Sequence, residues 1–170
     1  MTTFRHMILP FFFGLTLLLS AGCSEAEKVT PETEQKGATL ASYDLYKSPT
    51  CGCCEDWMVH MNERGYSAVV HHPADLNAVK AKLGVQPRYQ SCHTAVIGDG
   101  HVFEGHVPAR YIEAFLANPP QDAIGLAVPG MPIGSPGMEM GGRFDAYDVL
   151  LLKSDGSSEV YARVERADQQ

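Results

Sequence analysis

Three cysteines lie close together in the sequence, at Cys51, Cys53 and Cys54, with only Gly52 interposed. A strand-like run and a Ser-Pro-Thr turn precede them, and a helix-like pattern follows at once. Thiols at the start of a helix lie near the positive end of its dipole, which favours thiolate, and thiolates are both soft metal ligands and redox nucleophiles. The segment therefore predicts one of three kinds of site: a disulfide exchanger, a soft-metal site or a structural disulfide.

The apolar pattern along the chain predicts alternating strands and helices that position this turn. The expected elements are a strand over 42–47, a helix over 54–64, a strand over 67–71, a helix over 73–83, a hairpin of 94–97 with 102–104, and a helix that opens at 108 and closes at 118–120. This order resembles the thioredoxin-like α/β fold, a central mixed sheet flanked by helices, with a dithiol on the first strand–helix turn.

In that fold the loop before the third core strand faces the dithiol, and here that loop carries Cys92. We therefore expect a fourth thiol beside the other three. Thioredoxins proper hold a cis-proline at this loop, and no proline stands next to Cys92, which weakens the exchange interpretation. Cys53 weakens it further, because an interposed thiol would compete within a dithiol couple. Three thiols on one turn and a fourth across the cleft suit polythiolate metal binding.

Copper fits this donor set better than zinc or an iron–sulfur cluster. Structural zinc commonly uses two separated CxxC pairs, a spacing that is absent here, whereas Cu(I) is selected by soft thiolates and thioethers. Met131 and Met138 supply candidate thioethers, and His93 and His106 supply candidate imidazoles. The remaining mid-chain histidines are expected to be structural or at the surface: His60, His71, His72 and His101.

Residues 118–146 are rich in Gly, Pro and Met and are predicted to lack regular structure. Long ordered loops of this kind tend to be functional. Strands over 147–153 and 159–164, joined by a turn at 154–157, then predict a C-terminal hairpin, and the last polar residues are expected to fray.

The beginning of the chain resembles a bacterial lipoprotein signal. Arg5 precedes an apolar run over 7–19, and small residues lead to Cys23, which would carry the lipid. An ordinary secretory signal cleaved nearby is the alternative. We expect a signal peptide over 1–22, a flexible tether over 23–40 and a thioredoxin-like copper-binding domain over 41–166. Ser24 after the cysteine suggests, by resemblance to the sorting rule of enterobacterial lipoproteins, an outer-membrane location facing the periplasm.

The chain has 170 residues, 5 cysteines and a formal net charge of −7, enough for one domain of ordinary size with a true core. Its acidic balance argues against a nucleic-acid partner. The absence of a polybasic cluster argues against electrostatic docking on anionic lipid, so a membrane contact is expected through the lipid anchor only.

Four segments together resemble the CopG-type copper-resistance proteins: 47–54 (Lys-Ser-Pro-Thr-Cys-Gly-Cys-Cys), 91–94 (Ser-Cys-His-Thr), 104–108 (Glu-Gly-His-Val-Pro) and 130–139 (Gly-Met-Pro-Ile-Gly-Ser-Pro-Gly-Met-Glu). The resemblance covers about 43–161. It implies a periplasm-facing protein with a multinuclear copper site bridged by Cys51, Cys53, Cys54 and Cys92. It also implies copper ions and other copper-resistance proteins of the cell envelope as partners, and an oxidoreductase role that interconverts Cu(I) and Cu(II).

Three other functions stay open at this point. A cell-envelope thiol–disulfide oxidoreductase would use Cys51 and Cys54 as its couple. A passive copper store or chaperone would bind the metal without turnover. Two structural disulfides are the simplest possibility, although adjacent Cys53 and Cys54 make it awkward because each would need its own partner within reach.

Overall fold

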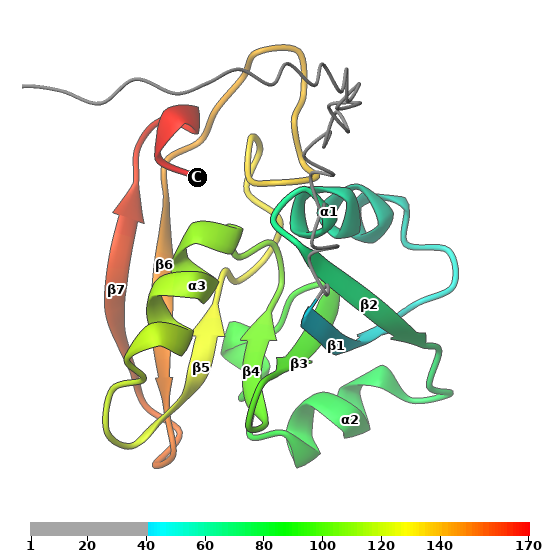
Figure 1. Ribbon diagram of the computed structural model, residues 1–170, viewed down its shortest axis with the longest axis vertical. Helices are drawn as coiled ribbons and strands as arrows, with labels where there is room; N and C mark the ends of the chain where they lie inside the picture. Colours follow the sequence, from blue (N-terminus) through cyan, green and yellow to red (C-terminus); the bar gives the residue numbers. More distant parts are fainter. Residues whose placement is uncertain (1–40) are drawn as a thin grey trace, which may run out of the picture. The chain divides into compact units, whose positions relative to one another are not determined.

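The computed structural model describes residues 41–170, which form a seven-stranded sheet and three α-helices (Figure 1). The elements are β1 (Ala41–Lys47), α1 (Gly52–Asn62), β2 (Tyr66–His71), α2 (Leu76–Lys82), η1 (Pro87–Tyr89), β3 (His93–Ile97), β4 (His101–Glu104), α3 (Ala109–Ala117), β5 (Ala123–Ala127), β6 (Tyr147–Lys153), β7 (Ser158–Val164) and η2 (Ala167–Gln169). Over this part of the chain, none of the helices has the length and apolar character needed to cross a membrane. The predicted signal peptide, tether and lipidation site at Cys23 lie outside the described residues.

The sheet is mixed, with strand order β2-β1-β3-β4-β5-β6-β7. The β1–β2 and β4–β5 pairs are parallel and the other neighbouring pairs are antiparallel. In the antiparallel β1–β3 pair, Lys47 at the end of β1 lies opposite His93 at the start of β3. The turn after β1 and the loop before β3 therefore leave the sheet at the same edge.

Side chains along the strands alternate between two apolar layers, as the period of a strand requires. Phe103 and Leu151 belong to the larger cluster, which also contains Trp57 of α1 and Phe115 of α3. Their chain neighbours Val102 and Leu152 belong to a smaller cluster with Val85, just after α2. The two faces are thus covered by different helices, and each buried side chain of this size contributes on the order of 2 kcal/mol.

Helix α1 is fixed to the core by its buried face while its first turn stays at the thiol site. Trp57 and Met61, four residues apart, are fully buried, and the Trp57 indole N–H donates to the carbonyl of Val107 at 2.9 Å. Cys51 occupies the N-cap with an extended backbone and makes no side-chain capping hydrogen bond. After the helix, Gly65 turns the chain into β2 with φ of 84°.

The predicted α/β architecture is confirmed, including the mixed central sheet, the long Gly/Pro/Met loop and the C-terminal β6–β7 hairpin. The narrower thioredoxin-like assignment stays a prediction. The expectation that all of 118–146 lacks regular structure is wrong, because β5 (Ala123–Ala127) fills the position between β4 and β6. Its Ala-Ile-Gly-Leu-Ala sequence has few strand formers, and pairing on both sides overrides that weak local preference.

The expectation of a frayed C-terminus is also wrong. Residues Ala167–Gln169 form a short 3₁₀ helix, and the Tyr111 hydroxyl donates to the carbonyl of Gln169 at 2.9 Å. The Tyr147 hydroxyl donates to the side-chain oxygen of Gln170 at 2.6 Å. Two tyrosines from the folded domain thus anchor the end of the chain.

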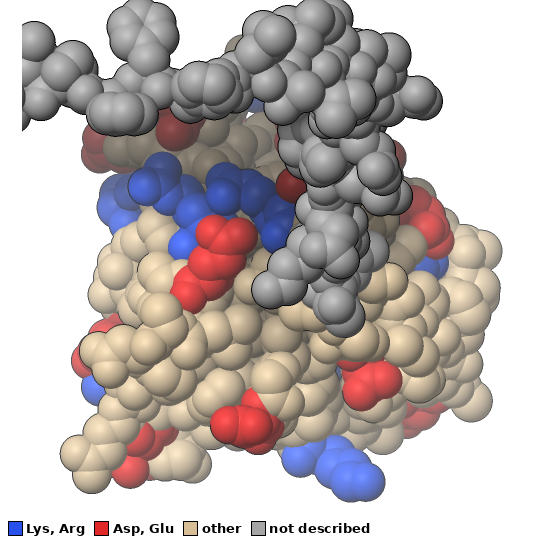
Figure 2. Space-filling view, in the orientation of Figure 1, with Lys and Arg blue, Asp and Glu red and all other residues tan. Residues whose placement is uncertain are grey.

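Charged side chains on the face in Figure 2 are few, and most of that face is uncharged. Lys and Arg gather in one band there, and acidic side chains lie against it. At the surface, Arg163 pairs with Asp148 at 2.9 Å and Arg166 with Asp168 at 3.1 Å. Exposed pairs of this kind contribute about 0–1 kcal/mol each, so they do not determine the fold.

Gly125 tests whether the close approach of β5 to β4 requires glycine. Its φ is 155°, and a Cβ added there would lie 1.7 Å from the carbonyl oxygen of Val102 on β4. Gly125→Ala should lower the free energy of unfolding by more than about 3 kcal/mol, measured by urea denaturation.

Gly141→Ala is the matched control, because Gly141 has φ of 58° and nothing within 4 Å of an added Cβ. Gly141→Ala should lower the free energy of unfolding only by the cost of placing alanine in a left-handed backbone conformation, about 1–2 kcal/mol. Equal losses in the two variants would show that the close approach of β5 to β4 is not what requires glycine.

Candidate metal centre

The turn after β1 gathers three cysteines around the first turn of α1. The Cys51 N–H donates to the carbonyl of Ser48 at 3.2 Å, which closes the turn. Cys51 and Cys53 are half-buried and Cys54 is fully buried. The sulfurs of Cys51 and Cys53 are 3.6 Å apart.

Cys51 and Cys54 are joined by a disulfide, with Cα atoms 5.4 Å apart. Cys53 and Cys92 are free thiols. The interpretation that the four cysteines form two structural disulfides is therefore wrong for the described residues. The Cys53 sulfur also lies near Cys51, at 3.6 Å, but it is not bonded to it.

Cys92 reaches the same place from far along the chain. It is the last residue before β3, and its sulfur and those of Cys51, Cys53 and Cys54 all lie within 4.8 Å of one another. The expected convergence of the four cysteines is confirmed. Burial raises the pKa of the Cys92 thiol to about 12, and the neighbouring Cys53 adds to the rise.

A second donor group shares Cys92. The Cys92 sulfur and ring nitrogens of His93 and His106 also lie within 4.8 Å of one another. The Cys92 sulfur is 3.0 Å from Nε2 of His106 and 3.3 Å from Nδ1 of His93. Cys92 thus joins a cluster of sulfurs to a pair of imidazoles.

The loop after β5 selects one tautomer of His106. Nδ1 of His106 lies 2.7 Å from the carbonyl oxygen of Pro136, and a carbonyl only accepts, so Nδ1 carries the proton. Burial lowers the pKa of His106, although the Pro136 bond opposes the shift, which keeps the ring neutral. Nε2 therefore presents its lone pair towards Cys92. A ring N–H fixed by a backbone carbonyl is the usual way in which a metal-binding histidine is oriented.

His93 is enclosed more completely. It is fully buried, its ring centre is 4.5 Å from that of Trp57 and 5.0 Å from that of His106, and its Nε2 has no hydrogen-bond partner within residues 41–170. Burial lowers the pKa of His93 well below its usual value, and the nearby His106 lowers it further. A neutral imidazole can bind a metal through either nitrogen, and in His93 Nδ1 lies near the Cys92 sulfur while Nε2 is the unpaired one, which is costly to bury.

The Gly/Pro/Met loop lies against this group. A Cβ added at Gly137 would be 2.7 Å from both the Cys53 carbonyl oxygen and the Trp57 backbone nitrogen, so the loop backbone packs on the first turns of α1 (Figure 1). Next to it, Met138 is half-buried. Met131 is 51% exposed, so the structure places it on the outer surface of the loop.

The other histidines have structural contacts, as expected. His60 Nε2 accepts from the Ala109 N–H at 3.0 Å, His71 pairs with Asp44 at 2.7 Å, His72 Nδ1 lies 3.1 Å from the Lys47 carbonyl oxygen, and the His101 ring meets that of Phe115 edge-on.

Sequence reasoning missed a set of buried charges close to the site. Lys47 is 1% exposed and pairs with Glu55 at 2.7 Å, and Lys80 pairs with Glu104 in the interior. One signal was available for Lys80, since it stands four residues after Leu76 on the apolar face of its helix.

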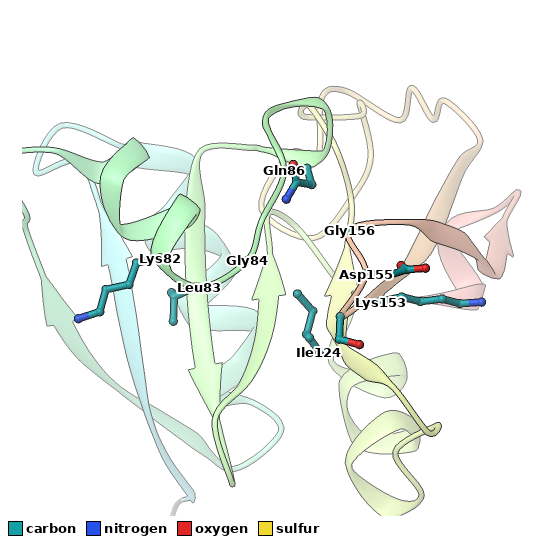
Figure 3. Close-up of a pocket in the computed structure, with 9 residues that line it drawn as sticks. Lys82, Leu83, Gly84, Gln86, Ile124, Lys153, Asp155 and Gly156 are labelled. Carbon is teal, nitrogen blue, oxygen red and sulfur yellow. The ribbon is translucent and has the colours of Figure 1, made fainter.

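Two hollows in the described residues lie away from the cysteines. One of about 310 Å³ lies between the end of α2 and the β6–β7 turn (Figure 3). It is lined by Lys82, Leu83, Gly84, Gln86, Ile124, Lys153, Ser154, Asp155 and Gly156. None of these is a cysteine or a histidine, so this hollow is not part of the metal centre.

The donors that converge are sulfur and imidazole nitrogen, without a carboxylate in either group. Such a set suits soft and borderline metals such as Cu(I) and disfavours Mg²⁺ or Ca²⁺, which prefer oxygen.

Comparison with known proteins agrees with this chemistry. A family model described as a protein of unknown function, DUF411, matches residues 89–138. Two solved structures titled copper resistance protein CopG, forms 1 and 2, are each 46% identical to the chain with a TM-score of 0.69. Form 2 covers 74% of this chain and 98% of its own, and form 1 covers 75% and 99%. No curated protein matched.

The raised pKa of Cys92 makes a kinetic prediction. A thiol with pKa near 12 gains thiolate throughout the range of about pH 8–10, so its alkylation by iodoacetamide should rise about tenfold per pH unit without a plateau. An ordinary thiol, with pKa of about 8.5, would level off in that range. Quantitative peptide mass spectrometry of Cys92 would measure the rate, and a plateau by about pH 10 would contradict the enclosed site.

Proposed function

Because this chain belongs to the family of the copper resistance protein CopG, we propose that it acts in copper resistance by binding Cu(I) at the cysteine cluster. The single observation that carries the proposal is the meeting of Cys51, Cys53, Cys54 and Cys92 within 4.8 Å. Soft thiolates select Cu(I) over harder ions.

The overlap of the two donor groups supports a site for more than one copper ion. Cys92 belongs both to the sulfur cluster and to the imidazole group with His93 and His106. A thiolate has several lone pairs and can bridge two ions, so Cys92 is the natural bridge between a sulfur-bound and an imidazole-bound copper. Half-buried Met138, which follows Gly137 in the loop, would add a thioether or a hydrophobic cover, and exposed Met131 would meet copper outside the cluster.

The cysteines also supply a redox step. Cleaving the Cys51–Cys54 disulfide takes up two electrons and yields the two thiolates that complete the sulfur cluster. Binding of the full copper load therefore requires a reduced site. We extend the proposal to interconversion of Cu(I) and Cu(II), with copper as the substrate: two Cu(II) ions would each take one electron from the reduced Cys51 and Cys54 thiolates, which gives two Cu(I) and the disulfide, and the reverse step returns both electrons. A passive copper store would show no such turnover.

The place of action rests on sequence outside the described residues. We propose a periplasmic protein held by lipid at Cys23, in the outer membrane, that exchanges copper with other copper-resistance proteins of the envelope.

A second candidate function has one observation in its favour. The Cys51–Cys54 disulfide, on a strand–helix turn, is the redox couple that a thiol–disulfide oxidoreductase would use. In that function Cys53 and Cys92 would take no part in the reaction, and copper binding would not be required.

Copper binding should depend on Cys92. In fully reduced protein, Cys92→Ser removes the shared donor, so Cu(I) affinity measured by competition with a chromogenic chelator should fall at least tenfold, about 1.4 kcal/mol, and the copper content should drop. His72→Gln, at an exposed position, is the control and should leave both values unchanged. Full copper binding by Cys92→Ser would overturn the proposed site.

Cys53→Ser separates the two functions. The copper site should lose affinity and copper content, because Cys53 is one of the four clustered sulfurs. The oxidoreductase function instead predicts unchanged reduction of a disulfide substrate such as insulin, because the Cys51–Cys54 couple remains. Insulin reduction that survives in Cys53→Ser, together with unaltered copper binding, would favour the second candidate.

A further inference from the structure

A buried ion pair lies in the interior next to the metal centre, and neither candidate function requires it. Lys80 of α2 is 1% exposed and Glu104 of β4 is 0% exposed, with 2.5 Å between the Lys80 nitrogen and Glu104 Oε1. Charged side chains are rarely buried this completely. The bonds that they make to other residues indicate why this pair is present.

Glu104 holds the chain on both sides of the Cys92–His93 dipeptide. Its Oε1 accepts from the backbone N–H of Ser91 at 2.6 Å, and its Oε2 accepts from the Thr94 hydroxyl at 2.6 Å. Lys80 completes the network by donating to the Thr94 hydroxyl oxygen at 2.9 Å. One carboxylate thus binds the residue before Cys92 and the residue after His93.

The two residues after Glu104 bind the dipeptide itself. The Gly105 N–H donates to the His93 carbonyl at 2.9 Å, and His106 Nε2 lies 3.0 Å from the Cys92 sulfur. A Cβ added at Gly105 would lie 2.5 Å from the Ser91 Cβ, so the two segments leave no room for a side chain at position 105. Each of residues 104–106 therefore contacts the segment 91–94.

A buried ion pair is a weak source of stability, because desolvation of both charges offsets their attraction and apolar replacements are often as stable. What a carboxylate provides here and an apolar side chain cannot is two acceptor oxygens for the Ser91 N–H and the Thr94 hydroxyl. Lys80 compensates the charge that makes those acceptors strong. The network is better explained by positioning than by stability.

We propose that Glu104, neutralised by Lys80, is a positioning residue of the metal centre: it fixes the backbone on both sides of Cys92 and His93 so that the thiol and the imidazole meet the other donors. The inference rests on the proposed copper function for its consequence in binding, but the fixed geometry of Cys92 can be tested without metal. The Lys80–Glu104 pair also links α2, which contributes no metal donor, to the metal centre.

A matched pair of double variants isolates this role. Lys80→Met/Glu104→Gln and Lys80→Met/Glu104→Met both remove the two charges and differ only at position 104, where Gln keeps an oxygen acceptor for the Ser91 N–H and Met does not. Asp148→Asn, in the exposed pair with Arg163, is the control for loss of an ion pair.

Two readouts are needed. In the reduced full chain, Cu(I) affinity by chelator competition should fall at least tenfold in the Met variant and stay within about threefold of the parent in the Gln variant. In metal-free protein, Cys92 alkylation should accelerate at least fivefold in the Met variant only, because the freed loop exposes the thiol. The control should match the parent in both.

The failures can be told apart. If the parent itself binds no Cu(I), the copper function fails, while the alkylation rates still test the positioning role. If both variants alkylate at the parent rate, or lose affinity equally, Glu104 does not position Cys92. If circular dichroism shows that the Met variant does not fold, Thr94→Val is the fallback, because it removes the hydroxyl that Glu104 Oε2 accepts from. Thr94→Val should accelerate Cys92 alkylation at least twofold, and an unchanged rate would overturn the proposal.

Discussion

The pairing of β1 with β3 is the constraint on which the site depends. Because the two strands are antiparallel and Lys47 lies opposite His93, the turn that carries Cys51 and the loop that carries Cys92 emerge at one edge of the sheet. A shift of one residue in this register would turn the side chains of β3 to the opposite face. The fully buried core on both sides of the strands makes such a shift costly, so the core holds the cysteines together.

Burial then sets the state of each donor. Enclosure keeps His93 and His106 neutral and Cys92 protonated, so metal binding at Cys92 must release its proton. The loop over 128–146 has two effects at once: its Pro136 carbonyl orients His106, and its backbone at Gly137 covers the first turn of α1. Donors that are oriented in advance lose little entropy when they bind a metal.

The four sulfurs lie within 4.8 Å of one another but differ in chemical state. A disulfide ties Cys51 to Cys54, while Cys53 and Cys92 remain thiols. The disulfide can therefore accept two electrons, and the turn then presents two more thiolates, so its affinity for a soft metal would follow its redox state. Behind it, the Lys80–Glu104 pair connects the second helix to the loop of Cys92, so the site extends into the interior beyond its donors.

The sequence by itself determined the α/β order and the C-terminal hairpin, because these follow from local periodicity. It also predicted the meeting of Cys92 with the first three cysteines, through the resemblance of that order to the thioredoxin-like fold. It also identified His93 and His106 as candidate ligands. Only the tertiary structure decided that Ala123–Ala127 is a strand, since pairing on both edges outweighs its local preference. It alone decided the partner of Cys54, the tautomer of His106 and the burial of Lys80 against Glu104. The tautomer of His106 and the burial of Lys80 depend on atoms distant in the sequence that meet only after folding, whereas the sequence left the partner of Cys54 open among several nearby thiols.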